Sequence, residues 1–223
     1  MLLFLACAPD RDPPALALLE TVPAAGAASP ANAPIRLRFN GWLDPEGVAA
    51  GAIDLHSGDL SFGFTAGYDP VDRALVIIPP VDLRVGLAYR LEVMPEAVRG
   101  LDGRRLAEPI TLDFVAGPPT NPRPPADPVP FARLQGLFAR ACDRCHGAEP
   151  LAWPPLTEQA LLMGESLRDP GRRLVAPGRP LESQLVLKLL PGYPGVHGAP
   201  MPLEGPPLTA DQVRTIIGWV EGL

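Results

Sequence analysis

The residues most clearly able to do chemistry are two cysteines and a histidine within positions 141–147, Ala-Cys-Asp-Arg-Cys-His-Gly. Two thiols at this spacing meet the two vinyl groups on one edge of a porphyrin, and the imidazole that follows reaches the iron from the same side. The spacing therefore predicts one covalent haem c. Cys142 and Cys145 are the expected attachment residues, and His146 is the expected proximal iron ligand.

Two other interpretations use the same cysteines. A thioredoxin-type redox pair is expected within an alternating βαβ pattern, which this half of the sequence does not show. A structural zinc site needs four ligands, and the remaining histidines are only His56 and His197. The zinc interpretation therefore requires recruitment of His197, and haem attachment is the favoured prediction.

An iron bound by His146 needs a sixth ligand, and Met163, His197 and Met201 are the candidates. Met201 lies in a proline-stiffened loop shortly before the last expected helix, and a thioether opposite an imidazole is a common pairing at haem iron. Met201 is therefore the predicted distal ligand, with His197 as the alternative. Met163 follows an apolar helical run and is expected in the core.

Two helices are expected to position these residues. Apolar residues recur at three- and four-residue steps over 131–141, which predicts a helix that runs into Cys142. Thr209 and Gln212 have the spacing of a capping box at the start of a C-terminal helix. Gly136 is expected to let that helix, with Trp219, approach closely. A backbone carbonyl within 153–155 is expected to accept a hydrogen bond from His146.

The region 131–223 resembles the small class I c-type cytochromes. The resemblance rests on Cys-x-x-Cys-His at 142–146, Met201-Pro202 and Ile217-x-Trp219. It implies an all-α haem domain whose terminal helices cross beside the haem. Because both axial positions are then filled by protein, one-electron transfer with redox partner proteins is the expected activity, and no catalytic residue is assigned.

Seven prolines within residues 117–130 mark a boundary, because proline removes backbone donors and favours extended conformations. Residues 118–130 are therefore predicted to be a linker. Residues 11–117 before it contain short alternating runs, which predict the strands of an all-β sandwich. The clearest runs are 35–39, 75–78, 89–93 and 110–114.

The first half also resembles the bacterial Ig-like domain of surface-layer and secreted proteins. The resemblance rests on Ile35–Phe39, Leu43-Asp44-Pro45, the turn at 100–106 and Leu112-Asp113-Phe114. It implies an immunoglobulin-type fold and no chemistry. A spacer or docking platform is the default expectation for this module. The expected fold is thus an all-β Ig-like sandwich over 11–117, followed by an all-α cytochrome c domain over 131–223.

The segment 1–10 begins with an apolar run over residues 1–7 that is too short to span a bilayer as a helix, which is typical of an export signal. Phe4-Leu5-Ala6-Cys7 resembles a bacterial lipobox, so Cys7 is a candidate for lipidation. An exported bacterial protein of the periplasm, the outer membrane or the cell surface is therefore expected. A net charge of −6 makes nucleic acid a poor candidate partner.

The overall expectation is an exported monohaem cytochrome for one-electron transfer. The alternatives are a haem-based sensor or peroxidase-like enzyme in which Met201 is displaceable, and a non-haem surface adhesion protein. The 31 prolines and 22 glycines favour short strands and turns over long helices throughout the chain.

Overall fold

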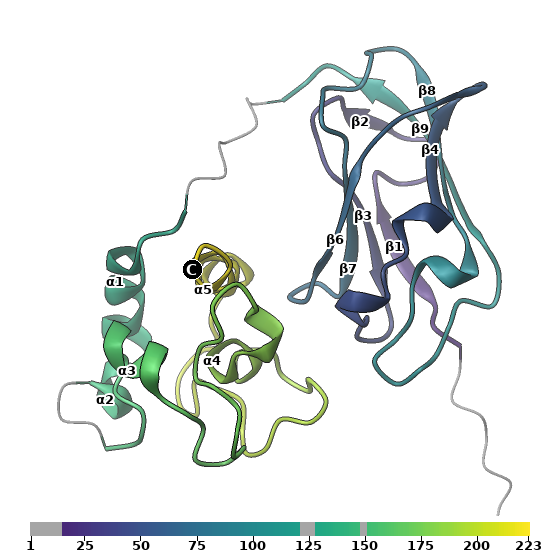
Figure 1. Ribbon diagram of the computed structural model, residues 1–223. Helices are drawn as coiled ribbons and strands as arrows, with labels where there is room; N and C mark the ends of the chain where they lie inside the picture. The colour runs from purple at the N-terminus through teal and green to yellow at the C-terminus, as the bar shows by residue number, and fades with distance from the viewer. Residues whose placement is uncertain (1–14, 121–127, 148–150) are drawn as a thin grey trace, which may run out of the picture. The chain divides into compact units, whose positions relative to one another are not determined.

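The computed structural model describes residues 15–120, 128–147 and 151–223. The chain divides into two compact units (Figure 1), the first made of residues up to 69 with 73–122, and the second of 70–72 with 123–223. The predicted segment 1–10, with Cys7, lies outside the described residues, as does most of the predicted linker. No helix in the described part of the chain is long and apolar enough to cross a membrane.

The first unit is a β-sandwich of two sheets (Figure 1). One sheet has the strand order β1-β3-β7-β6, and the other has the order β2-β9-β8-β4-β5, with β2 parallel to β9 and the other pairs antiparallel. The strands are β1 (Leu18–Val22), β2 (Ala28–Pro30), β3 (Ile35–Phe39), β4 (Ile53–Ser57), β5 (Leu60–Ser61), β6 (Thr65–Asp69), β7 (Ala74–Ile78), β8 (Ala88–Val93) and β9 (Ile110–Gly117).

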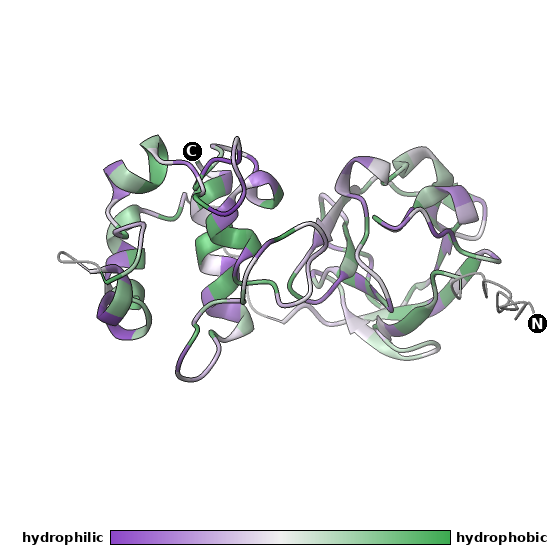
Figure 2. Cartoon of the chain, turned by 90° about the horizontal axis from the view of Figure 1, so that it is seen from below, coloured by the Kyte–Doolittle hydropathy of each residue, from purple (hydrophilic) through white to green (hydrophobic). Residues whose placement is uncertain are grey.

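Side-chain alternation explains why these segments form a sandwich. In β3 the residues Ile35, Leu37 and Phe39 are buried while the two arginines between them are partly exposed, and β8 and β9 alternate in the same way. The alternation is visible as green and purple bands along the strands (Figure 2). Because successive side chains point to opposite faces, each sheet turns one apolar face to the shared core.

The described residues of the second unit form five α-helices: α1 (Phe131–Ala141), α2 (Asp143–His146), α3 (Glu158–Met163), α4 (Gln184–Leu187) and α5 (Ala210–Glu221). Among these, α1 and α5 exceed two turns, and residues 151–209 are mostly turns and loops. The prediction of an all-α domain is therefore wrong. Proline and glycine interrupt this stretch repeatedly, so helices there cannot extend beyond one or two turns.

The two longer helices pack against each other. Leu134, Leu137 and Phe138 of α1 are buried, and the ring of Phe131 lies 5.2 Å from that of Trp219 in α5. The expected role of Gly136 is wrong, because a Cβ there would meet only Arg140 of its own helix. The close approach is at Gly218, where a Cβ would lie 3.3 Å from Val129.

Candidate functional site

Helix α1 delivers the cysteine motif. Cys142 caps the helix and donates its N–H to the carbonyl of Phe138 at 2.8 Å, and the chain then tightens into α2. The N–H groups of Cys145 and His146 both donate to the Cys142 carbonyl, at 3.0 and 2.9 Å. One short turn therefore holds the three half-buried side chains close together.

The imidazole of His146 is fixed in orientation and tautomer. Its Nδ1 lies 2.8 Å from the carbonyl oxygen of Pro154. A carbonyl can only accept, so Nδ1 carries the proton and the lone pair is on Nε2. The loop that provides Pro154 is tied to the motif by two backbone bonds, Ala152 N–H to Cys145 O and Leu156 N–H to His146 O, each 2.9 Å long. This arrangement is typical of metal-binding histidines.

A cavity of about 430 Å³ lies beside the motif. Cys142, Cys145 and His146 line it together with the loop that begins at Met201, which adds Leu203 and Leu208. Arg144 of α2 and Glu204 of the loop form an ion pair of 2.9 Å at its edge. Both of these side chains are well exposed, so the pair contributes little to stability.

Met201 is the one candidate distal ligand among the residues that line this cavity. Its N–H donates to the carbonyl of Lys188 at 2.7 Å. The side chain of His197 instead is 75% exposed and bonds to Asp169 through Nδ1. Met163 is 80% exposed, so its expected place in the core is wrong. Helix α3 ends at Met163, and Leu161 is the residue it buries.

The two cysteines are free thiols in the structure. Burial, with smaller contributions from Asp143 and Cys145, raises the pKa of Cys142 to about 11. Cys142 is therefore protonated near neutral pH, whereas a nucleophilic redox cysteine needs a lowered pKa. Across residues 15–120, 128–147 and 151–223, no three or more His, Cys, Asp or Glu residues are grouped to hold a metal ion. His197 does not line the cavity with Cys142, Cys145 and His146, so it is not placed as the fourth ligand of the zinc alternative.

Several polar residues near the site were not identified from the sequence. The side chains of Asp169 and Lys188 hydrogen-bond to His197 in the segment that leads to Met201, and Gln184 hydrogen-bonds to Asp169. No local pattern in the sequence indicates such bonds, because their partners lie 9 to 28 residues apart. Asp169 is only 7% exposed, and this burial, which the sequence does not indicate, is what marks it as part of a polar network.

No family model matches the chain, and no curated protein matches it. Solved structures similar to it include CopC from Methylosinus trichosporium OB3b, with 20% identity over 48% of this chain and 99% of that chain, at a TM-score of 0.36. PcoC, a methionine-rich copper resistance protein from Escherichia coli, has 18% identity over 46% and 99% of the two chains, at a TM-score of 0.35. The S-layer protein SbsC has 10% identity over 43% of this chain and 13% of that chain, at a TM-score of 0.35. Likeness at this level carries no conclusion about activity.

These comparisons correct the predicted identity. Neither a model of c-type cytochromes nor one of bacterial Ig-like domains matches the chain, and the similar structures just described are copper-resistance and S-layer proteins. The prediction of a monohaem c-type cytochrome on an Ig-like spacer, with haem c as cofactor and one-electron transfer as function, is therefore not retained. The sensor, peroxidase and adhesion alternatives gain no support either.

Proposed function

We propose that the second unit is a binding module for a transition-metal centre, with His146 and Met201 as the ligands to the metal and the thiols of Cys142 and Cys145 beside it. The observation that carries this proposal is the meeting of these four side chains around one cavity. They come from two segments more than fifty residues apart in the sequence.

The chemistry of the donors fits a metal of intermediate or soft character. His146 offers a lone pair on Nε2, because Nδ1 donates to Pro154. The thioether of Met201 has no proton to lose, so its availability does not depend on pH. Imidazole and thioether together suit iron or copper rather than magnesium or calcium, which prefer oxygen ligands.

The cavity itself supports binding rather than catalysis. Leu203, Leu208 and Ala152 give it apolar walls, and we assign no catalytic residue.

Iron and copper both change oxidation state, so redox partner proteins are the proposed class of partner. A periplasmic, outer-membrane or cell-surface location, with lipid attached at Cys7, completes the proposal. The proposed location rests on the apolar residues 1–7, and the proposed lipid attachment rests on the lipobox-like residues 4–7.

The test is metal analysis of the full chain purified from a bacterial host that exports it. Wild type is expected to contain close to one iron or copper per chain, and elemental analysis identifies which. His146→Ala should lose the metal, whereas Met201→Leu should keep a large part of it with an altered absorption spectrum. Intact mass under denaturing conditions records whether Cys142 and Cys145 remain free thiols. A wild-type chain without metal, or one whose metal survives His146→Ala, would overturn the proposal.

A further inference from the structure

The loop that presents Met201 has little backbone support of its own. It runs from α4 through Gly192, Gly195 and Gly198, whose φ values of 80°, 70° and 78° favour glycine. Within the described residues, its backbone hydrogen bonds are confined to the two ends, at Tyr193 N–H to Leu190 O and at Met201 N–H to Lys188 O. The middle of the loop must therefore be held by side chains.

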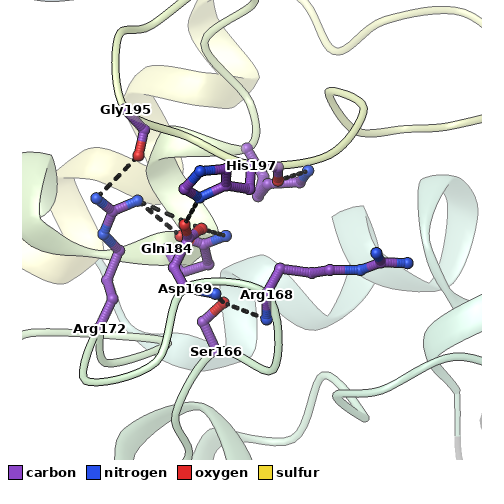
Figure 3. A network of polar contacts seen from close by, with 8 residues as sticks. Ser166, Arg168, Asp169, Arg172, Gln184, Gly195 and His197 are labelled. Carbon is purple, nitrogen blue, oxygen red and sulfur yellow. Dashed lines mark hydrogen bonds and ion pairs between the residues drawn. The ribbon is translucent and has the colours of Figure 1, made fainter.

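Three side-chain contacts hold that middle (Figure 3). Arg172 donates from Nη2 to the carbonyl of Gly195 at 3.1 Å. Lys188 donates from Nζ to the carbonyl of His197, also at 3.1 Å. The Nδ1 of His197 bonds to Oδ1 of Asp169. Two of the three contacts converge on His197, although its ring is largely exposed.

Asp169 is the residue of this network with the most contacts to its surroundings. It is buried, and its Oδ2 accepts a hydrogen bond of 2.8 Å from Nε2 of Gln184, which is also buried. Its own N–H donates to Oγ of Ser166 at 3.0 Å. Arg172 lies 3.5 Å from the carboxylate and donates to Oε1 of Gln184 at 3.2 Å. The carboxylate therefore cannot rotate freely, and it transmits this rigidity to His197.

We infer that Asp169 and His197 are positioning residues that hold the loop 192–201 and thereby place Met201 at the cavity. The inference rests on the proposed function, in which Met201 is a metal ligand. It gives His197 a role without ligation. His197 lies four residues before Met201, and its exposed ring bonds to the buried carboxylate of Asp169. The loop is therefore held close to the point where it enters the site.

The first test does not depend on the metal. Hydrogen–deuterium exchange is measured on peptides that cover 192–201 in wild type, His197→Ala and His197→Gln, because local opening controls exchange there. His197→Ala should speed exchange on the order of tenfold, since a hydrogen bond to a charged group is lost. His197→Gln keeps an N–H donor and should restore much of the protection. His56→Ala, in the other unit, is the matched control and should leave these peptides unchanged.

The second test reads Met201 directly. In metal-loaded protein, His197→Ala should keep the metal and lose part of whatever absorption feature Met201→Leu removes. Wild-type exchange in His197→Ala would overturn the inference, as would faster exchange with an unchanged Met201 feature. A wild-type chain that contains no metal overturns the proposed function instead, and the exchange measurement still decides whether His197 holds the loop.

Discussion

The interactions that stabilise the sandwich differ from those that stabilise the second unit. In the sandwich, buried residues are almost all apolar, and Ser29 is the single buried polar residue among those described there. In the second unit the buried polar residues are Ser166, Asp169, Ser183 and Gln184. Backbone pairing between strands holds the sandwich, whereas side-chain hydrogen bonds hold the loops of the second unit.

This difference explains where the candidate site lies. A loop can bring a methionine to a histidine far away in sequence, but it leaves backbone groups that need partners. The second unit provides those partners with buried polar side chains. The sandwich needs few of them and shows no comparable gathering of cysteine, histidine and methionine in its described residues.

The largest effect is expected from an apolar deletion in the sandwich. Phe114 is 2% exposed and its ring stacks on Tyr89 at 5.7 Å. Phe114→Ala should lower the free energy of unfolding of the first unit by about 3–5 kcal/mol. Denaturant titration followed by near-UV circular dichroism measures this.

Val115→Ala is the control, because Val115 is the next residue on the same strand and is 38% exposed. It should change stability by less than about 0.5 kcal/mol. If Val115→Ala lowered the free energy of unfolding as much as Phe114→Ala, burial in the apolar core would not account for the loss.

An intermediate effect is expected from a polar deletion in the second unit. Ser183 is fully buried, and its Oγ accepts from Ala176 N–H at 2.8 Å and donates to the Arg179 carbonyl at 2.9 Å. Ser183→Ala leaves both backbone groups without this partner and should cost about 1–3 kcal/mol. Urea unfolding of the second unit measures the loss. Exposed Ser61 in the sandwich serves as the control, and equal effects of Ser61→Ala and Ser183→Ala would remove the contrast between the units.

The smallest expected effect is on the pH dependence of the free energy of unfolding, when Asp169 is replaced by asparagine. Its hydrogen bond to His197, with further help from Gln184, lowers the pKa of this carboxyl. A lowered folded-state pKa stabilises the fold above the unfolded pKa of about 3.9, and this stability is lost as pH falls below that value. Unfolding curves between pH 3 and 7 should therefore show an acid-induced loss that Asp169→Asn reduces. An unchanged pH profile in Asp169→Asn would show that this carboxyl does not contribute.

The sequence predicted local elements well where burial follows a simple period. The runs at 35–39 and 110–114 coincide with β3 and the start of β9, and the capping box at Thr209 and Gln212 is present. Helix α1 ends directly before Cys142. In each case the pattern and the structure depend on the same neighbours along the chain.

The sequence predicted poorly where long-range side-chain contacts decide the structure. The loop-rich region 151–209 contradicts the all-α expectation, although the abundance of proline and glycine already disfavoured long helices. Met163 is exposed because α3 stops there. The partnership of Asp169 with His197 spans 28 residues, so only the folded chain brings it together.

The most direct test of the central claim is the number of metal ions per chain in wild type and in His146→Ala, with His56→Ala as the matched histidine control. The account predicts close to one iron or copper in wild type, a nearly complete loss in His146→Ala, and retention in His56→Ala. Equal metal content in wild type and His146→Ala, or none in wild type, would contradict it.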